Sequence, residues 1–200
     1  MLILNIAAGK FEPLPMSTKE DKMMPKFVIN VDTSYFMENT AADIEARIRA
    51  WYNDQDRITQ HSLLNMDVFE FMERTIFQYD RVVIYRFLEH VSFTQVEYFI
   101  YLVSTVLKSG GQVDVIVPNY IQLAEMILND DPSCSDFVAK NILLTTELLN
   151  EPSCPHASIW TPERMKYFWE LENRFKVGLQ HPAFKFDGRD IYLRSFIERI

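Results

Sequence analysis

The chain has 200 residues, of which 48% are hydrophobic and 14% aromatic, so it can bury a substantial core and is not a disordered polypeptide. Its formal net charge of -8 argues against a nucleic-acid-binding protein, which needs clustered Lys and Arg. We therefore expect one domain that spans residues 1–200.

The first element in the chain is an apolar run that leads into a turn of small residues, "MLILNIAAGKF". A run of this kind predicts a buried parallel strand that turns towards a helix, and in open α/β sheets ligands bind at that first turn. A dinucleotide site normally has the pattern G-x-G-x-x-G there. This chain has only Gly9, preceded by Ala7 and Ala8.

Strands and helices then alternate along the chain. Further strands are predicted for four apolar segments, 26–32, 61–67, 80–87 and 112–119. Helices are predicted for three segments with apolar residues at helical spacing, 40–53, 68–77 and 92–111. In the last of these, Ser92 is the expected N-cap, and Gly110 and Gly111 are expected to end the helix in a left-handed turn. This alternation is typical of a parallel sheet with helices on both faces.

The last part of the chain adds further helices and two terminal strands. Helices are predicted for 121–128 and 135–149, which are separated by the turn-forming "NDDPS". Another helix is predicted for "TPERMKYFWELENRF", with Thr161 as N-cap and a proline at the first helical position. The segments "FKVGL" and "RDIYLRSF" are expected to form strands that pair antiparallel at an edge of the sheet. Together these elements predict a doubly wound α/β fold.

The two cysteines and the lengths of the apolar runs bear on location and metal binding. The chain has only two cysteines, Cys134 and Cys154, in 200 residues. So low a number favours a reduced compartment. Zinc needs about four ligands, and Cys154 with His156 offers only two, so no metal site is expected. No signal-peptide pattern precedes the first strand and no apolar run reaches membrane-spanning length. We therefore expect a cytoplasmic protein without a membrane partner.

Five segments carry motifs in an order found in one protein family: "LNIAAGKF", "VINVD", "LLNMDVFEF", "YDRVVIYRFLEHV" and "LKSGGQVDVIVPN". The series resembles the successive motifs of Rossmann-like (class I) S-adenosylmethionine-dependent methyltransferases. Downstream, "HASIWTPERMKYFWELENRFKV" is similar to the end of small predicted methyltransferases, where a His and a T-x-E helix precede the last strands. The resemblance covers nearly the whole chain. It implies a mostly parallel seven-stranded sheet in the order 3-2-1-4-5-7-6, with helices on both faces.

The resemblance also implies S-adenosylmethionine as cofactor, bound by residues near the ends of the first four strands. These residues are Ala7, Ala8, Gly9, Asp32, Asp67, Val68 and Tyr85. The turn would admit the amino-acid part of the cofactor, Asp32 would accept hydrogen bonds from the ribose hydroxyls, and Asp67 would face the adenine amino group with Val68 or Phe69 near the ring. Independently of the family, carboxylates accept from hydroxyl and amino groups and suit a cationic sulfonium. Asp67 is equally a good N-cap for the helix that follows it.

Glu89 and His90, in the motif "FLEHV", are the candidate catalytic residues. The segment that follows the fourth strand would line the methyl-donor and substrate side. A histidine there can act as a general base because its ordinary pKa lies close to physiological pH. The alternative is that both residues only fix the loop after the fourth strand.

The leading functional hypothesis is methyl transfer to a small-molecule or metabolite-like acceptor. DNA is not expected as a substrate, because "YRFLEHV" replaces the Asn/Asp-Pro-Pro-aromatic pattern of amino-methylating nucleic-acid enzymes and no Pro-Cys nucleophile is present. Methyl transfer needs alignment more than a nucleophilic side chain. A second hypothesis, from a different class, is a catalytically inactive protein of the same fold that serves as a binding or assembly module. A third, another Rossmann-type nucleotide-binding protein, is disfavoured by the missing G-x-G-x-x-G.

Two positions depart from the family pattern and keep the second hypothesis open. Asn5 stands where the family usually has an acidic residue, and Ala7 stands where it has the first glycine. Many relatives also carry a helix ahead of the first strand, which this sequence lacks, so we expect an open pocket that a protein partner or a second copy completes. A compact domain of this kind would suit a phage-encoded protein.

Overall fold

The computed structural model of the chain describes residues 1–6, 26–32, 58–129, 156–182, 185–186, 189–190 and 192–200. The turn at residues 7–9 and the helices predicted for 40–53 and 135–149 lie outside these described residues.

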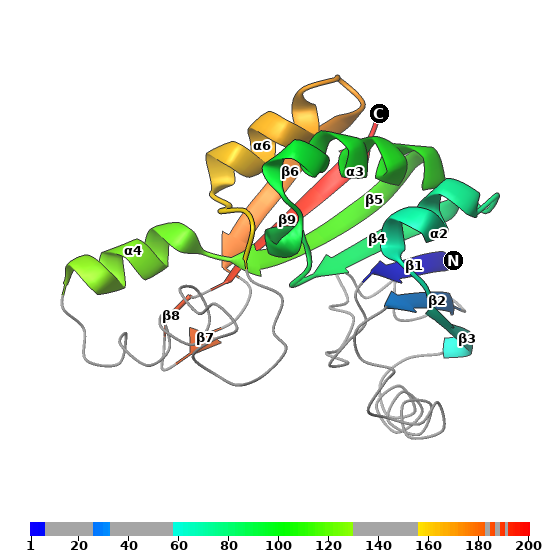
Figure 1. Cartoon of the computed structure of the whole chain (residues 1–200), viewed down its shortest axis with the longest axis horizontal. Helices are drawn as coiled ribbons and strands as arrows, with labels where there is room; N and C mark the ends of the chain where they lie inside the picture. The colour runs from blue at the N-terminus through cyan, green and yellow to red at the C-terminus, as the bar shows by residue number, and fades with distance from the viewer. Residues whose placement is uncertain (7–25, 33–57, 130–155, 183–184, 187–188, 191) are drawn as a thin grey trace.

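A seven-stranded sheet organises the described residues, in the order β3-β2-β1-β4-β5-β9-β6 (Figure 1). Its strands are β1 (Leu2–Ile6), β2 (Lys26–Asp32), β3 (Ile58–Asn65), β4 (Tyr79–Tyr85), β5 (Leu107–Pro118), β6 (Phe175–Pro182) and β9 (Tyr192–Arg199). The first five strands pair in parallel, whereas β9 pairs antiparallel with both β5 and β6. When the strands of this sheet alone are numbered along the chain, β9 is the seventh strand, and the order is the predicted 3-2-1-4-5-7-6. The predicted antiparallel pairing of the last two of these strands, β6 and β9, is confirmed as well. Two short strands, β7 (Lys185–Phe186) and β8 (Arg189–Asp190), form a separate ladder.

The central strands are buried on both faces, as their uninterrupted apolar sequences predict. In β1 the side chains of Leu4 and Ile6 are fully buried, and the intervening Asn5 is 5% exposed. In β4 the consecutive residues Val82, Val83 and Ile84 are buried in the same way. Parallel strands of this kind need cover on both sides.

Helices α2 (Val68–Arg74), α3 (Phe93–Val106) and α6 (Pro162–Glu170) lie on one face of the sheet (Figure 1). Their buried side chains join those of the strands in a single hydrophobic cluster that includes Phe99 and Trp169. The predicted cap of α6 is confirmed, because the Thr161 hydroxyl oxygen accepts a hydrogen bond from the Arg164 amide. The remaining described helices are α4 (Tyr120–Leu128) and the 3-10 turn η1 (Leu88–His90). Helices on the opposite face stay a prediction.

Helix α3 ends earlier than the sequence predicts. It stops at Val106, and the residues from Leu107 onwards belong to β5, with a shift in the β4–β5 register. The reason is that Leu107 is fully buried and pairs with Tyr79 of β4, which requires extended backbone. Gly110 does adopt the left-handed conformation, with φ of 72°, but it serves this irregular strand segment rather than the end of a helix.

The face of the sheet opposite α3 carries a buried ionic network. Asp114 alternates along β5 with Val113 and Val115, which pack in the hydrophobic cluster, so it points to the other face. Its carboxylate accepts hydrogen bonds from Arg81 at 2.6 Å and from Arg194 at 2.8 and 2.6 Å. The network therefore joins three neighbouring strands of the sheet, β4, β5 and β9.

Candidate active site

Strands β1 to β5 run parallel, so their carboxyl ends meet at one edge of the sheet, where open α/β sheets bind their ligands. β2 ends at Asp32, which pairs with Asn65 at the end of β3. β4 ends at Tyr85, which is half-buried. The structure thus brings two of the predicted cofactor-binding residues, Asp32 and Tyr85, to this edge. The predicted turn at residues 7–9 would follow β1 at the same edge but lies outside the described residues.

Asp67 and Val68 begin helix α2, directly after β3. The Asp67 carboxylate accepts hydrogen bonds from the backbone amides of Phe69 and Glu70, at 2.9 and 3.0 Å. The capping role that the sequence offered for Asp67 is therefore confirmed. Val68 is 5% exposed and packs in the hydrophobic cluster, whereas Phe69 is partly buried and stacks on Tyr98 of α3.

Asn5, which replaces the family's acidic residue, is engaged inside the sheet. Its side-chain amide donates to the side-chain oxygen of Asn30 at 2.9 Å, and Asn30 in turn donates to the backbone oxygen of Ser62. These bonds link β1, β2 and β3 and satisfy amides that are almost fully buried.

A compact polar cluster of Glu89, His90 and His156 lies just beyond the end of β4. Glu89 and His90 belong to η1, which begins shortly after Arg86, a residue in the left-handed region with φ of 49°. One side-chain nitrogen or oxygen from each cluster residue lies within 4.8 Å of those of the other two. The two imidazole rings meet edge to face, with 4.9 Å between their centroids.

Residues 157–160, which follow His156 in the chain, form hydrogen bonds to η1 and so hold His156 beside it. The backbone amides of Ala157 and Ser158 both donate to the backbone oxygen of Glu89, at 2.8 and 3.0 Å. The Ser158 hydroxyl and the Trp160 indole nitrogen donate to the backbone oxygen of Leu88, at 3.0 and 3.2 Å. Trp160 is fully buried. The cluster therefore rests on a rigid support.

Burial dominates the electrostatics of the cluster. It raises the pKa of Glu89 to about 7, an effect that its own backbone amide and the Arg86 charge only partly offset. The Oε2 atom of Glu89 has no hydrogen-bond partner among the described residues. Burial also lowers the pKa of His156 to about 4, helped by the nearby charges of His90 and Arg86. At neutral pH His156 is therefore a neutral imidazole with a lone pair to share.

Tyr120, in the first turn of α4, completes the surroundings of His156. Its hydroxyl and the Nδ1 atom of His156 are 2.7 Å apart and form a hydrogen bond. Burial and the Glu89 carboxylate raise the pKa of Tyr120, so the hydroxyl keeps its proton.

Sequence reasoning singled out Glu89 and His90 but missed His156 and Tyr120 as members of the same site. His156 was weighed only with Cys154, as an incomplete zinc pair. The signal that could have found it is the histidine that precedes the T-x-E helix in the family pattern. Its position beside η1 depends on the hydrogen bonds to Leu88 and Glu89, which no local sequence pattern encodes.

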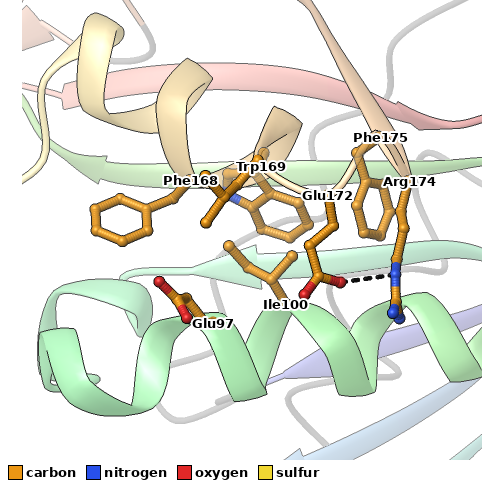
Figure 2. Close-up of a pocket in the computed structure, with 8 residues that line it drawn as sticks. Glu97, Ile100, Phe168, Trp169, Glu172, Arg174 and Phe175 are labelled. Atoms are coloured by element: carbon orange, nitrogen blue, oxygen red, sulfur yellow. Dashed lines mark ion pairs between the residues drawn. The ribbon is translucent and has the colours of Figure 1, made fainter.

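A separate small pocket lies between α3, the end of α6 and the start of β6 (Figure 2). Figure 2 shows Glu97 and Ile100 of α3 opposite Phe168 and Trp169 of α6, beside the ion pair of Glu172 and Arg174. Its space for water is about 10 Å³, enough for about one molecule. The pocket is therefore too small for a nucleoside cofactor and lies away from the carboxyl edge of the sheet.

Several solved structures that resemble the chain are methyltransferases. A SAM-dependent methyltransferase from Methanosarcina mazei is 17% identical and has a TM-score of 0.56, with 99% of this chain and 91% of that chain covered. The N-methyltransferase NodS from Bradyrhizobium japonicum is 15% identical with a TM-score of 0.57, covering 99% of this chain and 85% of its own. Magnesium protoporphyrin IX methyltransferase from Synechocystis, solved with bound S-adenosylhomocysteine, is 11% identical with a TM-score of 0.56, and the match covers 99% of this chain and 73% of that one.

These similarities show that the chain has the fold of class I S-adenosylmethionine-dependent methyltransferases. No protein-family model matches the sequence, and no curated protein matches it either. Among the described residues, no helix is both long enough and apolar enough to cross a membrane.

Proposed function

We propose that the protein is an S-adenosylmethionine-dependent methyltransferase that acts on a small-molecule or metabolite-like acceptor. The observation that carries this proposal is the sheet itself: five parallel strands followed by an antiparallel β9 inserted between β5 and β6, the topology expected from the sequence resemblance. NodS, whose fold the chain shares, was also crystallised with S-adenosylhomocysteine. The acidic net charge of -8 is consistent with an acceptor other than nucleic acid.

The cofactor is proposed to bind at the carboxyl ends of β1 to β4. Asp32 fits a ribose-binding role because it ends β2, next to β1 at the centre of the sheet. Asp67 and Val68 would border the adenine, Tyr85 would border the methyl donor, and Ala7, Ala8 and Gly9 would admit the amino-acid part. When bound, the cofactor would supply an activated methyl group on a sulfonium.

The acceptor is proposed to bind beyond β4, against the cluster of Glu89, His90 and His156. Methyl transfer requires the acceptor atom, the methyl carbon and the sulfur to lie in line, and the end of β4 adjoins both proposed sites. We propose that Glu89 and His90 activate the acceptor there, with His90 as the candidate general base. If so, His90→Ala should leave cofactor affinity nearly unchanged and lower turnover by about a hundredfold or more.

Isothermal titration calorimetry of the purified protein with S-adenosylmethionine and with S-adenosylhomocysteine tests the proposal. Saturable binding of one ligand per chain, unchanged in His90→Ala, is the expected result. Absence of binding by a folded protein would leave the inactive binding or assembly module as the better account. A cytoplasmic location, a phage origin, and a partner or second copy that completes the pocket stay predictions.

A further inference from the structure

We propose that Glu89, His90 and His156 form a binding site for one divalent transition-metal ion. The site itself stands on the geometry of the cluster. Its role in catalysis, which is to activate a hydroxyl group of the acceptor, rests on the proposed methyltransferase function.

The geometry of the three side chains is close to that of a metal site. Their candidate ligand atoms lie within 4.8 Å of one another, whereas ligands placed tetrahedrally about 2.1 Å from a metal would be about 3.4 Å apart. Small side-chain rotations can close this difference. Two imidazole nitrogens and one carboxylate oxygen make up the ligand set of many catalytic zinc and non-haem iron sites, which keep further positions open for water or substrate.

The burial of Glu89 is the second, independent observation. Its side chain is 1% exposed, and its Oε2 has no hydrogen-bond partner among the described residues. Buried carboxylates in proteins are normally paired with a cation or coordinate a metal, since an isolated buried charge is costly. A divalent ion between Glu89 and the two histidines would provide the missing partner.

The surroundings of His156 match those of a metal-ligating histidine. Such a residue usually engages its second ring nitrogen in a hydrogen bond that fixes the ring. Here Nδ1 of His156 and the Tyr120 hydroxyl are 2.7 Å apart and form a hydrogen bond. In the tautomer that carries its proton on Nδ1, this nitrogen donates to the Tyr120 oxygen and Nε2 keeps the lone pair that a metal needs. The amides of Ala157 and Ser158, bonded to the Glu89 backbone oxygen, keep His156 in place before any metal arrives.

One neighbouring charge works against a cation. Arg86 lies close enough to affect the pKa of both Glu89 and His156, and its positive charge repels a metal ion. Arg86 is an exposed residue, and its guanidinium lies over the Tyr192 ring, 5.5 Å from the ring centre. Replacing this charge with a neutral side chain, as in Arg86→Gln, should therefore tighten metal binding.

The metal would activate a hydroxyl acceptor in the following way. Coordination lowers the pKa of the hydroxyl, and its proton leaves to solvent water. The resulting oxygen attacks the methyl carbon, so that an oxygen–carbon bond forms while the sulfur–carbon bond breaks. The sulfur keeps the electron pair of that bond, which yields S-adenosylhomocysteine. In this scheme Glu89 and His90 act as metal ligands. This role replaces the general-base role proposed above for His90, because a nitrogen that coordinates the metal has no lone pair left to accept the proton.

Cobalt(II) is a suitable probe because its visible absorption reports the ligands. Untagged, EDTA-treated protein is titrated with CoCl₂ by calorimetry and absorption spectroscopy. We expect one ion per chain, and an affinity at least about tenfold lower in Glu89→Gln, His90→Ala and His156→Ala. His61→Ala is the matched control and should bind as wild type does, since His61 lies on β3, three strands away from β4 in the sheet. Arg86→Gln should bind more tightly than wild type.

Two results would overturn the inference: no saturable binding by folded wild type at millimolar Co²⁺, or Glu89→Gln binding as tightly as wild type. Circular dichroism confirms that each variant is folded, and Glu89→Gln keeps the shape of the side chain while removing its charge. Titration with S-adenosylhomocysteine separates the two proposals. Cofactor binding without cobalt binding would refute the metal site alone, whereas cobalt binding without cofactor binding would refute only the methyltransferase function.

Discussion

Removal of the Asp114 carboxylate should destabilise the protein strongly. Asp114 is fully buried and accepts hydrogen bonds from Arg81 and Arg194, whose side chains are 4% and 11% exposed. Truncation in Asp114→Ala leaves two poorly solvated guanidinium groups without this carboxylate. Breaking a buried ion pair in this way costs about 3–5 kcal/mol. Folded domains are stable by only about 5–15 kcal/mol, so the loss takes a large part of the total.

The assay is urea unfolding followed by circular dichroism, with the free energy of unfolding extrapolated to water. Arg74→Ala is the matched control, because the ion pair of Arg74 and Glu70 lies on the surface, with side chains 70% and 44% exposed. The control should lose no more than about 0.5 kcal/mol. A loss below about 1 kcal/mol in Asp114→Ala would refute the view that this network supports the sheet.

Three further predictions concern a glycine of β5, a surface ion pair and the cofactor. Gly111→Ala should destabilise the protein by about 1–3 kcal/mol, because the new Cβ would lie 2.7 Å from the backbone oxygen of Lys108. Burial would raise the pKa of Asp80, but hydrogen bonds from the Lys108 ammonium and the Leu2 amide lower it overall. Wild type should therefore lose stability relative to Asp80→Asn as the pH falls through the acid range. Asp32→Ala should weaken S-adenosylhomocysteine binding by about 1.5–3 kcal/mol.

Each of these predictions has its own readout. Urea unfolding of Gly111→Ala should be compared with Gly178→Ala, where the new Cβ would meet its nearest atom at 3.4 Å; equal losses would contradict the steric argument. For Asp80 the free energy of unfolding of wild type and of Asp80→Asn is measured from pH 5 down to pH 3, around the ordinary aspartate pKa of about 3.9. Parallel curves for the two proteins would show that the partners of Asp80 do not favour its charged form. Unchanged calorimetric affinity in folded Asp32→Ala would remove Asp32 from the cofactor site.

The strands and the Thr161 cap could be predicted because their signals are local. Ser92 does precede α3 as expected, but its side chain makes no capping hydrogen bond. Continuous apolar runs indicated β1 and β4, and the Thr161 cap with its following proline indicated the start of α6. The order of the strands came from the family resemblance, since no local pattern specifies which strands are neighbours. The end of α3 was misjudged, because burial of Leu107 outweighed the helical pattern that continues up to the glycines.

The candidate site was only half predictable for a related reason. Glu89 and His90 stand together in one motif, but His156 reaches them through backbone hydrogen bonds between distant parts of the chain. Pairings of that kind depend on the folded sheet and not on spacing in the sequence. The missing partner of Glu89 likewise became visible only once its burial was known.

Binding of S-adenosylhomocysteine to wild type and to Ala7→Gly, measured by calorimetry on folded protein, tests the central claim most directly. The account predicts saturable binding of one ligand per chain to wild type, and tighter binding to Ala7→Gly because the first turn regains a glycine that lets the ligand approach the backbone. Failure of both proteins to bind at millimolar ligand, which sets the binding free energy weaker than about -4 kcal/mol, would contradict the methyltransferase function.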